Sequence, residues 1–237
     1  MIFESIKCFK CSHVNPPHKS NCEQCKNHLR ERYVNLDLWN TILLLIEEPK
    51  TAFRNIIYSE HKNFIFFLLF FISIKNLIIA RFISVPELGL NNVTSPLVSS
   101  LLLSTIMTAT LLVLIAIVFQ ILNKKNDVKI RFIDVFSISV YSFIPYLIGL
   151  LLVFPVQLIV LGSDIFSNNP YAFQIKPTIS YILMGLELIM ILWTIILFYK
   201  SVSIVYSKRI TALLMVLIFA FLWFTFLFLA SKFIFIL

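Results

Sequence analysis

Charged residues and glycine are both scarce in this chain of 237 residues. Only 14% of the residues are charged, against about 25% in typical soluble domains, whereas 59% are hydrophobic. A water-soluble fold cannot hide that much apolar surface, and the apolar residues lie in long runs. With four glycines but 24 phenylalanines, packing through aromatic side chains is expected in place of close glycine crossings. The composition therefore predicts a protein whose main solvent is lipid.

The sequence also lacks the short motifs of common enzyme classes. It has no His-Glu-x-x-His motif, no glycine-rich phosphate loop, no nucleophile elbow and no paired aspartates across hydrophobic segments. His61 is the only histidine outside the first thirty residues. An apolar signal-peptide core is also missing, because residues 1–35 are polar and hold the cysteines. We therefore expect a non-enzyme whose N-terminus stays in the cytoplasm.

The net charge of +8 could indicate a nucleic-acid surface. The basic residues instead lie mainly in the first sixty positions and in two short loops that flank apolar segments. Lysine and arginine placed in that way mark the cytoplasmic side of membrane helices. We therefore expect a lipid bilayer, and no nucleic acid, as the partner of these charges.

All four cysteines lie within eighteen residues, as Cys8-x-x-Cys11 and Cys22-x-x-Cys25. Two such pairs have the ligand spacing of a zinc site in which four thiolates close a tetrahedron and leave no position open for chemistry. Metal binding would supply the folding energy that so short a segment cannot obtain from a hydrophobic core. The sequence therefore predicts a structural zinc ribbon over residues 1–33.

Two other uses of these cysteines compete with structural zinc. Disulfides would need an oxidising compartment, which a cytoplasmic location denies, and a redox site would need only one Cys-x-x-Cys pair on a thioredoxin-like unit. His13, His18 and His28 lie nearby, and one of them could replace a cysteine as ligand. We favour zinc on four cysteines, with the three histidines exposed to solvent.

The cysteine segment resembles the minimal zinc ribbons that begin many prokaryotic membrane proteins. In those ribbons proline usually follows the first cysteine of a pair and glycine follows the second. Here the corresponding residues are Phe9 and Ser12, then Glu23 and Lys26. The cysteine spacing is unchanged, so these departures bear on the geometry of the turns. The resemblance implies a role in docking partners or organising the terminus.

Residues 34–62 have the pattern of amphipathic helices that lie on a membrane surface. Apolar residues recur at helical spacing, first as Trp39, Leu43 and Ile46, then as Phe53, Ile56 and Ile57. Pro49 divides the segment, because proline is tolerated in the first turn of a helix but not inside it. The basic face predicted for an anionic leaflet consists of Lys50, Arg54, His61 and Lys62.

Five hydrophobic segments follow, at residues 63–83, 97–122, 135–161, 178–199 and 210–236. Each reaches the roughly 20 residues that a helix needs to cross the hydrocarbon core. The loops after the second and fourth segments are basic, whereas the alternate loops contain one basic residue, Lys176. The positive-inside rule then places the N-terminus in the cytoplasm and the C-terminus outside. The predicted fold is an all-α bundle of five transmembrane helices, residues 63–237, behind the ribbon and the amphipathic segment.

Charged side chains inside these segments are few and need a partner or a water-filled cavity. At ~1.5 Å of rise per residue, Lys75 in the first span and Glu187 in the fourth lie roughly 18 and 16 Å from the cytoplasmic side. We therefore predict a Lys75–Glu187 ion pair, completed by Asn76 or Gln157, that ties the two spans together. Gating of a proton or ion path is its alternative role. Arg81 is expected to extend to the outer interface.

Two prolines, Pro145 and Pro155, fall within the third span. Proline removes a helical hydrogen bond, so both positions are predicted to kink the helix. A break that lines a substrate cavity is the alternative, because unwound backbone is tolerated at such places.

Two stretches resemble the Yip-domain family of membrane proteins. They are Glu48-Pro49-Lys50-Thr51-Ala52-Phe53-Arg54-Asn55-Ile56 and Arg131-Phe132-Ile133-Asp134-Val135-Phe136, the second leading to Tyr141-Ser142-Phe143-Ile144-Pro145. The resemblance covers about residues 40–237, and prokaryotic members with a leading zinc ribbon are similar in layout. Eukaryotic members bind Rab-type GTPases and shape vesicle membranes, whereas some bacterial relatives assemble alongside ABC-type exporters. The resemblance carries over no catalytic residue.

These observations predict a non-catalytic scaffold or accessory subunit of the inner membrane, in an ABC-type export complex, with the zinc ribbon docking a partner. A transporter or channel in its own right is one alternative, and a membrane-shaping protein is another. A homo-oligomer is compatible with each of them.

Overall fold

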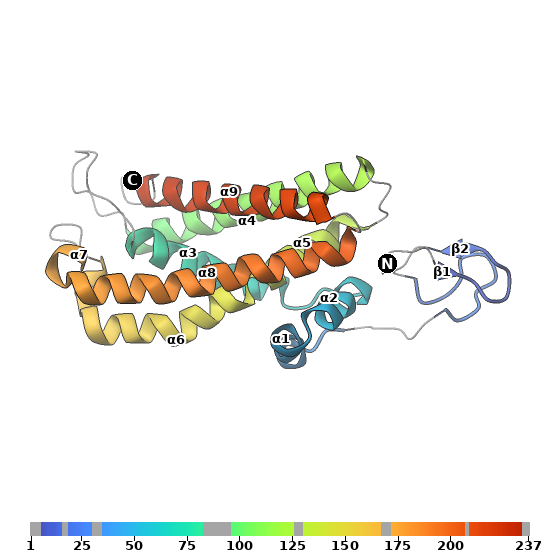
Figure 1. The fold of residues 1–237 in the computed structure, drawn as a ribbon, viewed down its shortest axis with the longest axis horizontal. Helices are drawn as coiled ribbons and strands as arrows, with labels where there is room; N and C mark the ends of the chain where they lie inside the picture. Colours follow the sequence, from blue (N-terminus) through green and yellow to red (C-terminus); the bar gives the residue numbers. More distant parts are fainter. Residues whose placement is uncertain are drawn as a thin grey trace. The chain divides into compact units, whose positions relative to one another are not determined.

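The protein is described here by a computed structural model, whose helices and strands Figure 1 labels. It describes residues 6–15, 19–29, 35–82, 96–125, 130–166, 172–206 and 209–233. Contacts divide the chain into two units, and each unit is built from several stretches of sequence. The first unit comprises Met1–Ile65, Leu114–Ser142 and Ile196–Leu217, and the second comprises Phe66–Val113, Phe143–Ile195 and Ile218–Leu237.

Five spans in the described part of the chain are long and apolar enough to cross a membrane. They are Ile65–Phe82, Leu97–Leu122, Phe132–Ile165, Pro177–Val205 and Arg209–Ser231. The helices that form four of them are α3 (Ile65–Phe82), α4 (Leu97–Lys125), α8 (Pro177–Val205) and α9 (Arg209–Phe233). Each of these helices carries apolar side chains on all of its faces, as expected where lipid is the solvent. The predicted five-span membrane fold is confirmed.

The third span consists of two helices, α5 (Phe132–Ser142) and α6 (Ile144–Leu161), with Phe143 between them. Pro145 lies in the first turn of α6, where its missing N–H leaves no helical bond unmade. Helix α6 continues through Pro155. The chain then passes through a short 3-10 helix, η1 (Gly162–Phe166), and the four-residue helix α7 (Ala172–Ile175). The interruption of the span therefore lies beside Pro145 and not at Pro155.

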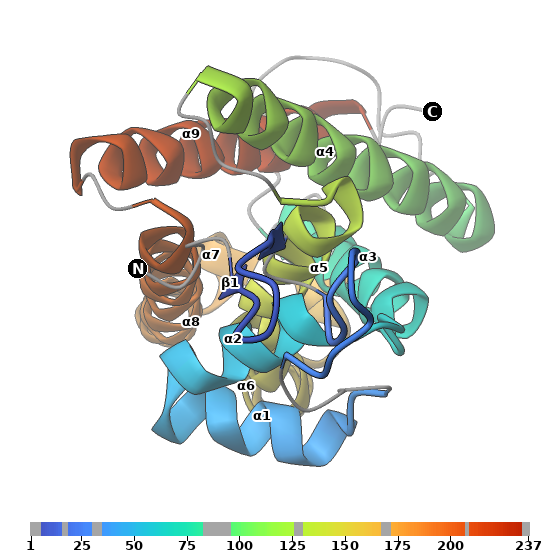
Figure 2. The same ribbon diagram turned by 90° about the vertical axis from the view of Figure 1, so that its right-hand side faces the viewer.

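Two short helices precede the spans: α1 (Leu38–Glu47) and α2 (Pro49–Tyr58), which Figure 2 shows side by side. Asp37 caps α1 by accepting a hydrogen bond from the Asn40 N–H, and Pro49 opens α2. The apolar stripe of α1 is exposed, with Trp39, Leu43 and Ile46 at 74%, 56% and 46%. This exposure fits the predicted amphipathic helix.

The second apolar stripe of the predicted amphipathic segment has a different environment. Helix α2 packs against α1 and α5, and it buries Phe53, Ile56 and Ile57 within the protein. Of these two helices, α1 alone therefore exposes its apolar stripe. Of the two predicted amphipathic helices, the first exposes its apolar stripe and the second packs its stripe within the protein.

Aromatic side chains fill much of the core of the second unit. Trp223 is fully buried, and its ring lies 4.8 Å from that of Phe143 and 5.1 Å from that of Tyr146, measured between centroids. Both pairs meet edge to face, the arrangement that aromatic quadrupoles favour. A second aromatic group joins Phe82, Phe173 and Tyr181. The helices are thus held by large rings, as the composition indicates.

Candidate metal centre and buried ion pairs

Each cysteine pair forms a tight turn that backbone hydrogen bonds close in the same way. The N–H of Ser12 donates to Cys8 O at 2.9 Å, and the N–H of Lys26 donates to Cys22 O at 3.0 Å. The N–H of Cys8 donates to His13 O, and the N–H of Cys22 donates to Asn27 O, both at 2.8 Å. A two-stranded antiparallel sheet, β1 (Ile6–Lys7) and β2 (Val14–Asn15), flanks the first turn. The segment therefore presents two equivalent knuckles.

The knuckles keep their shape without the glycines that usually follow the second cysteine. Ser12 and Lys26 occupy those positions with φ of 57° and 58°. A residue with a side chain adopts this left-handed conformation at a cost of about 1–2 kcal/mol. The two departures from the usual ribbon pattern therefore cost stability and leave the backbone path of the knuckle intact.

The four sulfur atoms lie close enough together to hold one metal ion. Cys8 Sγ and Cys25 Sγ are 3.4 Å apart, Cys11 Sγ and Cys22 Sγ are 3.5 Å apart, and all four sulfurs lie within 4.8 Å of one another. A tetrahedral zinc ion with Zn–S bonds of about 2.3 Å requires sulfur separations of about 3.8 Å. None of the four cysteines forms a disulfide. The predicted ligand set therefore has the geometry of a metal site.

The surroundings shift the pKa values of these thiols in opposite directions. The N–H of Cys11 lowers the pKa of the Cys8 thiol. Burial opposes ionisation of Cys22, but the N–H groups of Cys25 and Gln24 and the Asn15 side chain lower its pKa to about 6. The N–H of His13 favours a Cys11 thiolate, whereas burial and the neighbouring sulfurs raise its pKa to about 12. Four thiolates at these distances need a positive ion between them.

The nearby histidines stand apart from this group of sulfurs. Among the residues that the structure describes, the cluster able to hold a metal consists of the four cysteines alone. His13 is partly buried and His28 is exposed, whereas His18 lies outside the described residues. The described histidines therefore do not stand in for a cysteine.

The structure brings Lys75 and Glu187 together within the second unit. Lys75 Nζ lies 2.5 Å from Glu187 Oε1, and both side chains are almost completely buried, with exposures of 0% and 4%. The side chain of Gln157 donates to the same oxygen at 3.0 Å. The other carboxylate oxygen, Oε2, is buried and has no hydrogen-bond partner in the described part of the chain. Of the two residues predicted to complete the ion pair, Asn76 and Gln157, it is Gln157 that bonds to Glu187.

Asn76 belongs to a neighbouring set of hydrogen bonds. Its side chain donates to the Thr108 hydroxyl and accepts from the Tyr146 hydroxyl, both at 3.1 Å. The Tyr146 ring centroid lies 5.7 Å from Lys75 Nζ, within the range of a cation–π interaction. Residues of α3, α4 and α6 are thus linked around the ion pair by polar contacts.

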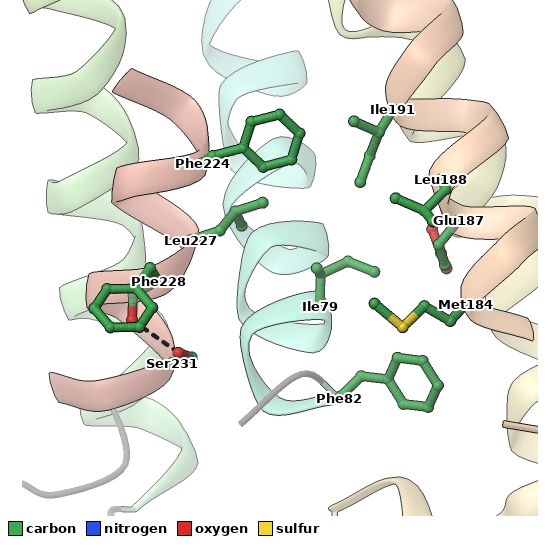
Figure 3. Close-up of a pocket in the computed structure, with 10 residues that line it drawn as sticks. All are labelled: Ile79, Phe82, Met184, Glu187, Leu188, Ile191, Phe224, Leu227, Phe228 and Ser231. Atoms are coloured by element: carbon green, nitrogen blue, oxygen red, sulfur yellow. Dashed lines mark hydrogen bonds between the residues drawn. The ribbon is translucent and has the colours of Figure 1, made fainter. Parts of the chain in front are cut away.

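An apolar cavity of about 430 Å³ lies beside the ion pair, between α3, α8 and α9 (Figure 3). Its lining consists of Ile79, Phe82, Met184, Glu187, Leu188, Ile191, Phe224, Leu227, Phe228 and Ser231. Glu187 is the only charged residue among these ten, and the Ser231 hydroxyl donates to Phe228 O at 2.7 Å. These ten lining residues do not form a continuous row of polar groups that could carry an ion.

A second buried charge cluster, Lys62, Arg131 and Asp134, lies in the first unit, and our sequence prediction missed it. Asp134 is buried and accepts two hydrogen bonds from Arg131, Nε to Oδ2 and Nη2 to Oδ1, each at 2.8 Å. Lys62 Nζ lies 3.0 Å from Asp134 Oδ1. We call these three residues the α2 clasp, because both cations also bond to the end of α2.

The α2 clasp supplies donors to carbonyls that the last turn of the helix leaves without partners. Lys62 donates to Ile57 O at 3.0 Å and Ser59 O at 2.9 Å, and also to Ile56 O. Arg131 Nη2 donates to Ser59 O at 3.3 Å. Positive charge at a helix C-terminus interacts favourably with the helix dipole. The cluster therefore fixes α2 to the start of α5.

The prediction that Lys62 belongs to an exposed basic face is wrong. Its side chain is 3% exposed, whereas Lys50, Arg54 and His61 are exposed. The stretch from Arg131 to Asp134 held a signal, since side chains three positions apart around the start of a helix lie on the same side. No local pattern indicated that Lys62, from a distant part of the chain, joins them.

Comparisons with known proteins bear on the membrane part of the chain. Neither the curated proteins nor the solved structures compared with it gave a match. The family profile described as the Yip1 domain matches residues 43–231, from the second half of α1 to the end of the fifth span. The matched region excludes the cysteine knuckles. The resemblance seen in the sequence is confirmed, and the chain belongs to the Yip1 domain family.

Proposed function

We propose that this protein is a non-catalytic scaffold or accessory subunit of the inner membrane, in which a zinc-bound ribbon docks a partner. Its five membrane spans anchor the ribbon at the cytoplasmic face, and the C-terminus lies on the other side. The observation that carries the proposal is Phe9, which stands between two metal ligands and is fully exposed, at 102%.

Phe9 has the properties of an anchor residue in a protein interface. A metal on Cys8 and Cys11 would fix the backbone on both sides of it, so little conformational entropy would be lost on binding. Rigid aromatic side chains are common where binding energy is concentrated. Lys7 and Lys10 are exposed close to it in the chain, and Val14 is half-exposed. The expected partner surface is therefore an apolar pocket with acidic residues at its rim.

The membrane helices support an anchoring role. Their buried charges are paired, as Lys75 with Glu187, and the cavity beside this pair is apolar. The exposed apolar stripe of α1 fits insertion into the lipid headgroup boundary, beside the exposed Lys50 and Arg54 of α2. We name an ABC-type exporter as the expected partner because the Yip-domain resemblance implies that association for bacterial relatives.

Mass spectrometry of the complex extracted from native membranes tests the proposal. We expect a membrane-protein partner to copurify with the wild type, and Phe9→Ser to reduce its recovery by about tenfold or more while the metal is retained. Phe66→Ser is the matched control, because Phe66 is also exposed but lies on α3. Wild-type protein that is always recovered alone would contradict the proposal, and a partner other than an exporter would correct its identity.

The second candidate, a proton or ion path, rests on the position of Glu187 at the edge of the cavity. It predicts that reconstituted protein conducts protons or ions and that Glu187→Gln abolishes this flux. Absence of flux in liposomes, or flux that persists in the variant, would exclude the path. In that case the ion pair serves to hold α3 and α8 together.

A further inference from the structure

Among the described residues of the ribbon, Asn15 is the polar side chain buried most deeply, with an exposure of 0%. It lies on β2, and its amide reaches both knuckles. The Nδ2 atom donates to His13 O at 2.9 Å on the first knuckle and lies 3.5 Å from Cys22 Sγ on the second. The Oδ1 atom accepts the N–H of Glu23 at 2.9 Å. One side chain therefore connects the two halves of the ribbon.

The hydrogen bonds fix which way round the amide lies. Reversing it would set the NH₂ group against the Glu23 N–H and the oxygen against the His13 carbonyl, two contacts between like groups. The NH₂ group must therefore face both the carbonyl and the Cys22 sulfur. Cys22 itself is almost completely buried, so no water competes for that sulfur.

We infer that Asn15 is a positioning residue of the metal site, which holds Cys22 Sγ in the ligand position and donates an N–H to it. A donor on a metal-bound thiolate withdraws charge from the sulfur and restricts its orientation. Partners of this kind, one shell outside the ligands, typically contribute 10–100-fold in metal affinity. The inference rests on the metal-bound ribbon of the proposed function and names one more residue that this ribbon needs.

The test compares two amide-to-carboxylate changes in the full-length protein in detergent, with Zn²⁺ and Co²⁺ as probes. Asn15→Asp keeps the acceptor for Glu23 but loses both donors and places negative charge beside the thiolate. Asn27→Asp is the matched control, because its side chain makes a single exposed contact, to His28 O at 3.4 Å. We expect Asn15→Asp to bind Zn²⁺ 10–100-fold more weakly in competition with a chelator, and Asn27→Asp to stay within about threefold of wild type.

Asn15→Ala tests whether Asn15 acts by donating an N–H to the Cys22 sulfur or only by holding the two knuckles together. With Co²⁺ bound, loss of an N–H donor to the thiolate should shift the sulfur-to-cobalt charge-transfer band, while the ligand-field bands stay tetrahedral. A variant with wild-type affinity and an unshifted band would overturn the inference. So would failure of both Asn15 variants to bind Co²⁺ at saturation, since Asn15 would then be needed for folding and not for tuning the site. Wild-type protein that binds neither metal would instead refute the metal-bound ribbon of the proposed function.

Discussion

The ribbon and the membrane helices differ in what their interiors contain. In the described part of the ribbon the buried side chains are Cys8, Asn15 and Cys22, so it has no apolar core. The second unit buries whole aromatic rings, among them Trp223 and Tyr146. An apolar core is stable by itself, whereas a group of thiols gains its stability from the ion that they bind. The two regions should therefore respond to entirely different perturbations.

Charge provides a second contrast between the two regions. The membrane helices bury opposite charges as pairs, so removal of one partner leaves the other uncompensated. The ribbon gathers four groups that ionise to the same sign, and they repel one another until a cation is bound. The first arrangement fails through single substitutions, and the second fails through loss of the metal.

Removal of the metal should have the largest effect, confined to the ribbon. Structural zinc contributes about 10–16 kcal/mol of binding free energy in small zinc domains, which is more than the ribbon can replace. Chelator treatment, or Cys22→Ser, should expose the ribbon to limited proteolysis while the far-ultraviolet circular dichroism of the helices stays constant. Proteolytic protection that survives complete chelation would show that the ribbon folds without metal.

Glu187→Gln should produce the largest effect of a single substitution in the helices. It leaves the Lys75 ammonium buried without a counter-charge, which typically costs about 3–5 kcal/mol. We expect a lower unfolding temperature in detergent and unchanged metal binding. Glu47→Gln is the control, since that carboxylate is exposed. The pair Lys75→Met with Glu187→Leu should recover much of the loss, and wild-type stability of Glu187→Gln would argue against a structural ion pair.

Asp134→Asn should have a smaller effect, because Arg131 is 35% exposed and can be hydrated. Lys62 would still lose the buried carboxylate that lies 3.0 Å from its Nζ. We expect a loss of about 1.5–3 kcal/mol, the usual range for a hydrogen bond to a charged group, seen as a lower unfolding temperature. Asp37→Asn is the control, because asparagine caps a helix as well as aspartate does. Equal stability of the two variants would mean that the α2 clasp is dispensable.

Glycine at the two strained positions should have the smallest effect, and it should be stabilising. Ser12→Gly and Lys26→Gly each remove the strain of a positive φ, and after the entropy of glycine is subtracted we expect a gain of about 0.5–1 kcal/mol per site. The rate at which a chelator removes the metal measures this gain, and we expect a slower release from the glycine variants. Ser20→Gly is the control, because Ser20 has no positive φ and should gain nothing. Faster release from the double variant would refute the strain argument.

The sequence by itself determined the features that depend on local pattern. Long apolar runs set the five spans, Pro49 set the division between α1 and α2, and the cysteine spacing set the ligand group. Each of these signals acts within one stretch of chain, since a helix needs a certain length to cross lipid and a knuckle needs two ligands at fixed spacing.

Only the tertiary structure decided which side chains meet. It placed Gln157 rather than Asn76 on Glu187, buried Lys62 beside Asp134, and set Asn15 between the knuckles. Successive residues of a helix differ in direction by about 100°, so the rotation of each helix selects its contacts. That rotation follows from the packing of distant segments, which no local pattern records.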